Sequence, residues 1–144
     1  MEGWSDALAF AHTRSHVQHA HSVLDFSTSV EGVTAMLVNF HQMPERTVSG
    51  MNGGTGQISA KMFLDSHGKV ICCRIHVGGS IGTHRHETSD DINYVLSGNG
   101  KAVCDGKEEI LTAGCCHICK KGSEHSIVKT GSEDLCLLTV VAER

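Results

Sequence analysis

Proline and aromatic residues are scarce in this sequence. Pro44 is the only proline among 144 residues, and Phe, Trp and Tyr together make up 4% of the chain, whereas glycine occurs 16 times. Few prolines and many glycines favour tight turns between short strands, because glycine adopts the positive φ angles that such turns require. We therefore expect a chain rich in β-strands, with few long helices.

Long apolar runs, an export signal and a strong net charge are also missing. No apolar run approaches the roughly 18 residues that a membrane-spanning helix needs, and no basic segment followed by an apolar stretch stands near Met1. The net charge of -4 gives no reason to expect nucleic acid or an anionic membrane as a partner. The seven cysteines are odd in number and include two adjacent pairs, which favours reduced thiols. The sequence predicts a cytoplasmic protein.

The N-terminal part of the chain differs in its residue pattern from the rest. We expect residues 1–45 to form a short helical or extended arm with a leading strand or helix, and residues 46–144 to form one domain. The apolar segment 30–40 is expected to pack on that domain. Three histidines of the arm have a spacing that would place them on one helix face, but no acid or thiol accompanies them, so we favour a solvated arm over a metal site. They are His12, His16 and His19.

From Gln57 onward, short apolar and β-branched segments alternate with turn signals such as Gly78-Gly79 and Asp105-Gly106. A spacing of about ten residues per strand and turn is typical of an antiparallel sandwich or barrel. The sequence therefore predicts an all-β domain.

Four residues in this region have the chemistry and the spacing of a metal site. His84 and His86 are two positions apart, so on a strand both imidazoles point to one side. Asp91 opens the next strand after a turn, and an antiparallel return would place its carboxylate across from the histidine pair. His125, which starts a later strand, is the natural third imidazole. Imidazoles and a carboxylate on one face are the elements of a site for Fe(II) or a similar ion with open positions.

These residues fall within two spaced glycine–histidine motifs. The first motif comprises Gly78, His84, His86, Asp91 and Gly98, and the second comprises Gly114, Gly122 and His125. In these motifs and in the interval between them, the sequence resembles the cupin superfamily, and most of all its short one-domain members, over roughly residues 50–142. The resemblance implies a jelly-roll β-barrel or sandwich, a homodimer, and one divalent transition metal (Fe, Mn, Ni, Zn, Co or Cu) held by His84, His86, Asp91 and His125.

The sequence departs from the family pattern at three positions. Asp91 stands where the family usually has Glu, so the shorter side chain reaches the ion, acts through a water, or leaves the ion to three histidines. Asp90 is its rival, but alternation and motif spacing both favour Asp91. The other departures are Lys120 for the motif proline and Lys129 for the motif asparagine.

Other polar residues near the motifs have open roles. Asn93 shares the face of Asp91, where it either hydrogen-bonds a ligand or is satisfied by a neighbouring strand. Cys116 and Cys119 point to opposite faces of a strand, which argues against a redox pair, and we expect Cys116 or Ile118 to line the barrel. Met51 and Met62 are expected in the core or a subunit interface. We assign no catalytic residue; the candidates that depend on an inward orientation are His76, His117 and Glu124.

Taken with the resemblance, the metal site predicts a metal-dependent enzyme acting on a small oxygenated molecule. The reaction classes are an isomerase, a lyase or a dioxygenase, because the open positions of the ion suit a bidentate substrate. The alternative is a non-catalytic barrel that binds or senses a small ligand, since one fold hosts many functions.

Overall fold

The computed structural model describes residues 28–30 and 33–144. The predicted histidine face of the arm lies outside the described residues. The strands are β1 (Thr28–Val30), β2 (Val33–Ala35), β3 (Arg46–Ser49), β4 (Gln57–Asp65), β5 (Gly68–Ile75), β6 (Ser80–Arg85), β7 (Ser89–Ser97), β8 (Asn99–Cys104), β9 (Lys107–Thr112), β10 (Cys116–Cys119), β11 (Glu124–Thr130) and β12 (Leu135–Glu143). Two 3-10 turns, η1 (Phe40–Gln42) and η2 (Met51–Gly53), flank β3.

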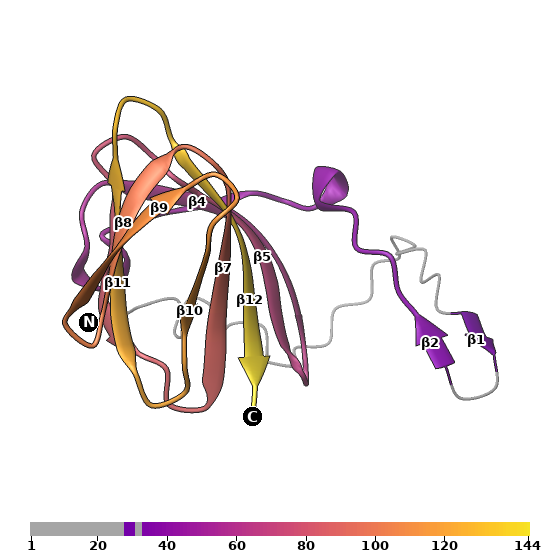
Figure 1. Cartoon of the computed structure of the whole chain (residues 1–144). Helices are drawn as coiled ribbons and strands as arrows, with labels where there is room; N and C mark the ends of the chain where they lie inside the picture. Colours follow the sequence, from indigo (N-terminus) through magenta and orange to yellow (C-terminus); the bar gives the residue numbers. More distant parts are fainter. Residues whose placement is uncertain (1–27, 31–32) are drawn as a thin grey trace.

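Two antiparallel sheets form the main body of the molecule. One sheet has the order β10-β7-β12-β5-β4-β3 and the other the order β6-β11-β8-β9, while β1 and β2 pair only with each other. Figure 1 shows the two larger sheets as opposite walls of a barrel, with the β1–β2 hairpin outside it. The predicted all-β fold is confirmed. Within the described residues, no helix has the length and apolar character that crossing a membrane would need.

The core lies between the two sheets, and its polarity changes along the barrel. Inward-facing positions alternate along each strand, as the two-residue period of a β-strand requires. On β12, Leu135 and Leu137 are fully buried and are followed on the same face by Thr139. On β7, Val95 is fully buried, and the residues on its face nearer the start of the strand are the buried polar residues Asn93 and Asp91. The apolar core thus fills one end of the barrel and leaves polar groups facing inward at the other.

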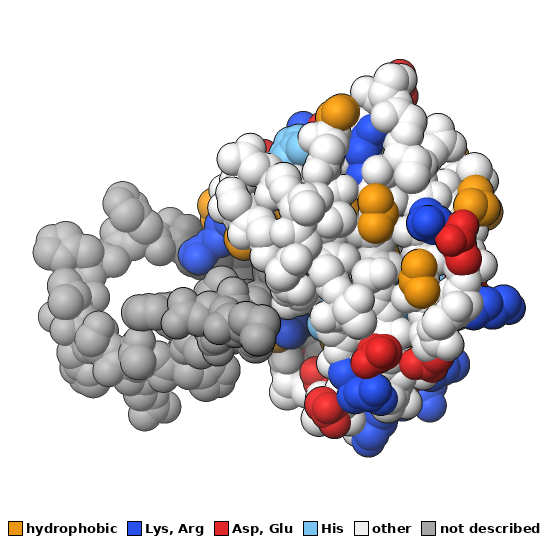
Figure 2. Space-filling model, turned by 90° about the vertical axis from the view of Figure 1, so that its left-hand side faces the viewer, with side chains coloured by type: hydrophobic (Ala, Val, Ile, Leu, Met, Phe, Trp, Pro, Cys, Tyr) orange, Lys and Arg blue, Asp and Glu red, His pale blue; other side chains and the backbone are white. Residues whose placement is uncertain are grey.

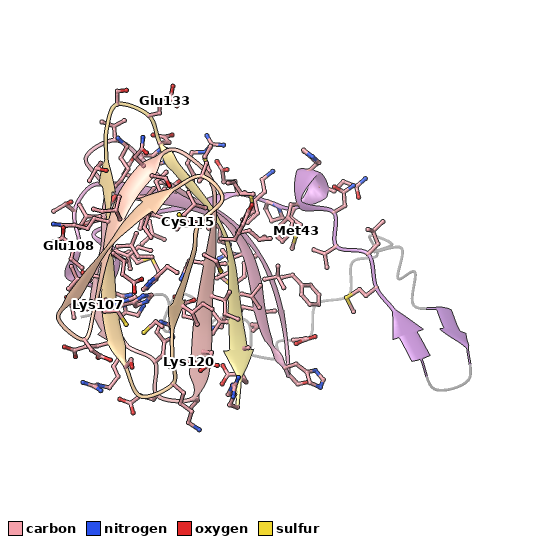
Figure 3. All side chains as sticks on the ribbon, viewed as in Figure 1. Met43, Lys107, Glu108, Cys115, Lys120 and Glu133 are labelled. Atoms are coloured by element: carbon pink, nitrogen blue, oxygen red, sulfur yellow. The ribbon has the colours of Figure 1, made fainter. Side chains whose placement is uncertain are left out.

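The outer face of the four-stranded sheet is mostly polar. Figure 2 shows separate hydrophobic side chains on the face of the four-stranded sheet, with acidic and basic side chains gathered at one end. In Figure 3, Lys107 and Glu108 project from the outside of the barrel. Single exposed apolar residues of this kind are normal for a folded protein.

The structure describes part of the apolar segment 30–40 that was expected to pack on the domain. Val30 ends β1, residues 33–35 form β2, and Phe40 begins η1; β1 and β2 pair with each other and not with a barrel strand. Met36 is 62% exposed and Leu37 is 90% exposed, whereas Val38 and Phe40 are half-buried. Packing of the whole segment on the barrel stays a prediction.

Candidate metal centre

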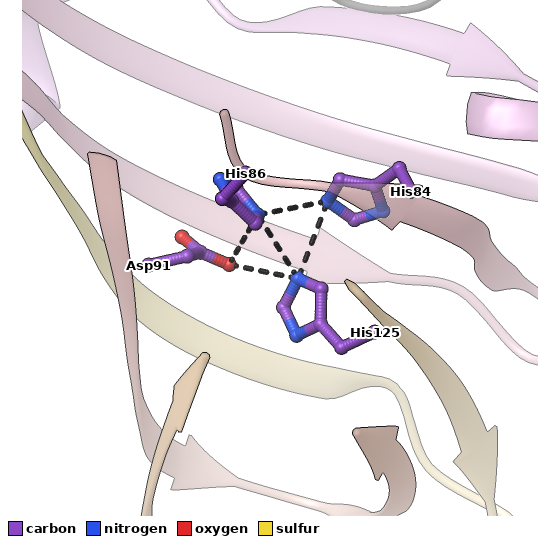
Figure 4. A group of neighbouring side chains, drawn as sticks. All are labelled: His84, His86, Asp91 and His125. Atoms are coloured by element: carbon purple, nitrogen blue, oxygen red, sulfur yellow. Dashed lines mark hydrogen bonds and ion pairs between the residues drawn. The ribbon is translucent and has the colours of Figure 1, made fainter. Parts of the chain in front are cut away.

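Three strands and one turn bring four potential ligands together inside the barrel. His84 lies on β6 and His86 directly follows that strand, while Asp91 lies on β7 and His125 on β11. β11 pairs with β6 so that His125 is opposite His84. One nitrogen or oxygen atom from each of the four side chains lies within 4.8 Å of the others (Figure 4).

The spacing of the three imidazoles fits a single ion. The Nε2 atom of His86 is 3.1 Å from the Nε2 atoms of both His84 and His125, and those two are 3.2 Å apart. Metal–nitrogen bonds of about 2.1 Å that meet at right angles would separate two ring nitrogens by about 3.0 Å. Hydrogen bonds alone do not explain the triangle, because each neutral ring nitrogen offers either one hydrogen or one lone pair.

The backbone beside His84 fixes the form in which its ring is present. The Nδ1 atom of His84 lies 2.9 Å from the carbonyl oxygen of Gly82, so Nδ1 carries the hydrogen and Nε2 presents its lone pair to the cluster. Burial lowers the pKa of His84, and the Gly82 carbonyl only partly opposes this, so the ring stays neutral as a ligand must. A β-carbon at Gly82 would lie 2.1 Å from the carbonyl oxygen of Asn52, so glycine is what lets β6 pass so close to η2.

The carboxylate of Asp91 is held in place by polar neighbours. Its Oδ2 atom lies 3.1 Å from Nε2 of His125 and 3.5 Å from Nε2 of His86. The side-chain amide of Asn93 donates to Oδ2 at 2.8 Å, and Thr139 in turn donates to Asn93 at 2.7 Å. Burial raises the pKa of Asp91, but hydrogen bonds from His125, His86 and Asn93 outweigh it and hold the pKa well below its usual range. Asp91 is therefore ionised inside the barrel.

Asp90, the rival of Asp91, faces away from the histidines. It accepts hydrogen bonds from Lys120 Nζ at 3.1 Å and from the backbone N–H of Lys121 at 2.9 Å, and it pairs with Arg144 at 2.9 Å. The period of β7 separates the two acids, so Asp90 anchors the β10–β11 turn and the end of the chain.

The face of β10 that points into the barrel is not the expected one. Cys116 is exposed and Ile118 is 46% exposed, so the expectation that one of them lines the barrel was wrong. Instead His117 and Cys119 are buried, because β10 pairs with β7 so that His117 is opposite the inward-facing Asn93. That pairing is the signal that identifies His117 as an interior residue.

The other two candidates for a catalytic base lie elsewhere. His76 contacts Ser59 at 2.7 Å and Asp134 at 3.1 Å, and Glu124 pairs with Arg85 at 3.1 Å. Neither His76 nor Glu124 lines the cavity described next.

A cavity of about 380 Å³ is lined by three of the four potential ligands, His84, His86 and Asp91. Met51 and Met62 belong to its wall, and Met51 also packs against the apolar core, where we expected it. The lining also includes the amides of Asn52 and Asn93, the hydroxyls of Thr88, Ser89 and Thr139, and several charged residues. The charged residues of the lining other than Asp91 are Lys69, Arg85, Glu87 and Glu143.

Comparison with known proteins gives a consistent result. The cupin domain family matches residues 72–141. An oxalate-binding protein of Thermotoga maritima is 32% identical over 114 residues, which cover 75% of this chain and 94% of that protein. The pectin degradation protein KdgF of Dickeya dadantii is 32% identical over 72 residues, which cover 49% of this chain and 66% of that protein.

Solved structures agree with these sequence matches. The crystal structure of a predicted oxalate decarboxylase from Thermotoga maritima superposes with a TM-score of 0.72 and 29% identity, covering 76% of this chain and 100% of that one. An RmlC-like cupin from Shewanella frigidimarina has a TM-score of 0.62 at 15% identity, covering 76% of this chain and 92% of that one, which shows the fold alone. With two inward histidines on the first motif, a third on the second, and these relatives, the chain belongs to the cupin superfamily as a small single-domain member.

Proposed function

We propose that the chain binds one divalent transition-metal ion through His84, His86, Asp91 and His125, and through this ion a small bidentate oxygenated anion such as oxalate. The observation that carries the proposal is the meeting of three ring nitrogens and one ionised carboxylate beside a cavity of about 380 Å³. The ion supplies Lewis-acid polarisation of the oxygens bound at its open positions. Fe, Mn, Ni, Zn, Co and Cu all accept this donor set.

The charge of the site favours an anion. Three neutral imidazoles and one carboxylate compensate one of the two positive charges of a divalent ion, so a net positive charge remains. The lining carries two cations, Lys69 on β5 and Arg85 on β6, and two acids besides Asp91, so its net positive charge comes from the ion. The two acids are Glu87 and Glu143. The similarity to a protein named for oxalate binding supports the same class of ligand.

Apolar side chains of the cavity wall limit the size of the cavity and the water inside it. Met51, Met62, Ile71 and Val141 present apolar surface to it, which limits water around the bound ligand. The hydrogen bonds from Thr139 to Asn93 and from Asn93 to Oδ2 of Asp91 restrain the carboxylate oxygen that faces the histidines.

Catalysis on the same class of molecule, by an isomerase, lyase or dioxygenase reaction, is the second candidate function. The observation that favours it is the presence of Lys69, Glu87 and Glu143 in the cavity lining, since each is a group able to transfer a proton. The similarity to KdgF, a pectin degradation protein, adds uronates to the molecules worth testing.

The test measures metal and ligand binding together. Protein purified without an affinity tag is analysed for bound metal, loaded with Mn²⁺ or Zn²⁺, and titrated with oxalate by calorimetry. H86A and H125A are expected to lose the ion and with it oxalate binding. H76A is the matched control, because His76 lies outside the cavity and bonds to Ser59 and Asp134. Equal metal content in wild type, H86A and H125A would refute the proposal.

The same preparation separates binding from catalysis. Oxalate, 2-oxo acids and uronates are incubated with the metal-loaded protein, with and without dioxygen, and the products are analysed by mass spectrometry. Turnover that H125A abolishes would establish the enzyme; retention of unchanged oxalate would establish the binding protein.

A further inference from the structure

A line of three side chains runs from the protein surface to one of the potential ligands. Glu109 on β9 lies 2.7 Å from Nδ1 of His117 on β10, and Nε2 of His117 lies 2.8 Å from Nδ1 of His125 on β11. The side chain of Glu109 is 39% exposed, whereas those of His117 and His125 are 0% and 1% exposed. The line therefore connects solvent to the buried cluster and joins both sheets.

The two rings meet edge to edge. Their centroids are 5.1 Å apart and their planes are inclined by 21°, while the facing nitrogens are 2.8 Å apart. A nearly shared plane is the arrangement in which an N–H of one ring points at the lone pair of the other.

Counting hydrogens along the line gives one consistent assignment when His125 binds an ion. A metal-bound Nε2 of His125 has no hydrogen, so the hydrogen of this neutral ring is on Nδ1 and is donated to His117. His117 then accepts with Nε2 and carries its own hydrogen on Nδ1. That hydrogen is donated to Glu109, whose carboxylate is an acceptor. All three groups are satisfied, and the lone pair of His125 faces the cluster.

We propose that Glu109 and His117 are positioning residues that orient His125 and fix its metal-binding tautomer. The proposal rests on the metal site of the proposed function and adds two residues beyond the four potential ligands. A carboxylate at the outer end strengthens the donor bond of His117, and His117 in turn makes His125 a better electron donor.

The first test measures zinc affinity by competition with a chromogenic chelator. H117F removes the acceptor for His125, and we expect zinc affinity to fall by about 10- to 100-fold. H117Q is the conservative rescue, because its amide oxygen accepts from His125 while its amide nitrogen donates to Glu109; we expect affinity near that of wild type. E109L tests the outer end of the line and is expected to give a smaller loss.

The matched control is E108L, which removes the neighbouring acid. Glu108 is more exposed than Glu109 and pairs with Lys101 at 3.1 Å on the outside of the barrel, so its loss should leave zinc affinity unchanged. Equal affinities for wild type, H117F and E109L would overturn the proposal. Absence of zinc binding by wild type would instead refute the metal site itself.

The second test reads the tautomers directly. Ring ¹⁵N shifts of zinc-loaded protein, labelled at histidine, should show that His117 carries its hydrogen on Nδ1 and has a bare Nε2. In E109L this preference should weaken while the fold, judged from backbone amide shifts, persists. A hydrogen on Nε2 of His117 in zinc-loaded wild type would contradict the assignment even if H117F failed to fold.

Discussion

The Oδ2 atom of Asp91 on β7 lies 3.1 Å from the Nε2 atom of His125 on β11, so the acid of one sheet meets an imidazole of the other. Asp91 is ionised there although it is buried. We predict that D91N, which keeps the shape of the side chain but removes its charge, lowers metal affinity. Loss of a residue that only hydrogen-bonds to a ligand lowers metal affinity by roughly 10- to 100-fold, and we expect the effect of D91N to be at least as large. Chelator competition with Mn²⁺ or Zn²⁺ measures this.

D91E is the informative companion to D91N. It restores the carboxylate with one more methylene, the length that the family pattern usually has at this position. We expect D91E to bind the ion more tightly than D91N, because charge matters more to a divalent ion than a small displacement. Metal binding by D91N at the level of wild type would show that Asp91 acts only as a hydrogen-bond partner of the histidines.

Much of this site follows from the sequence because strand periodicity acts over short distances. His84 and His86 share a face by simple alternation, and the same rule separates Asp91 and Asn93 from Asp90. The structure places each of these as alternation requires. The positions of the motif glycines then supply the turn lengths that bring distant strands into register.

The parts that sequence reasoning missed depend on how a strand is paired. β10 is four residues long, too short for its own pattern to fix which face turns inward. Its pairing with β7 decides that His117, and not Cys116 or Ile118, enters the barrel. The exposure of Met36 and Leu37 has a related cause, since apolar composition alone does not say which surface a segment covers.

Lys69 tests whether the cavity selects anions. Its position in the lining predicts that K69A weakens oxalate binding to the metal-loaded protein while leaving metal affinity unchanged, because Lys69 is not among the four potential ligands. Loss of one charge-assisted hydrogen bond is worth roughly 1.5–3 kcal/mol, or about 10- to 150-fold in affinity. Calorimetric titration of oxalate into the manganese-loaded protein measures the effect.

K61A provides the control for K69A. Lys61 lies on the neighbouring strand β4 opposite Cys72, whose side chain is on the strand face away from Cys73 and the cavity. The two variants thus remove the same charge from opposite faces of one sheet. Oxalate affinities that fall equally in both would indicate a general effect of net charge and would exclude a specific contact with Lys69.

We expect Asp90 to make the stability of the barrel depend on pH. The backbone N–H of Lys121 is the main group that lowers the pKa of Asp90; burial opposes it, and Lys120 and Arg144 lower it further. Lys120 lies at the lower end of the barrel in Figure 3, where the chain also ends in Figure 1. The folded state therefore holds fewer protons than the unfolded state between the lowered pKa and the ordinary value of about 3.9.

The lower pKa of Asp90 in the folded state determines how the stability changes with pH. A carboxyl group with a lowered pKa stabilises the folded state above its unfolded pKa, and that contribution is lost as pH falls through the folded pKa. We predict that D90N is less stable than wild type at neutral pH and that the gap closes below about pH 4. Urea unfolding of chelator-treated protein across a pH series measures it. E133Q, which removes an exposed loop carboxylate, should show no such closing gap. The contrary result is a difference in stability between D90N and wild type that stays constant down to pH values well below the pKa of an ordinary aspartate. Asp90 would then contribute through its shape and not through its charge.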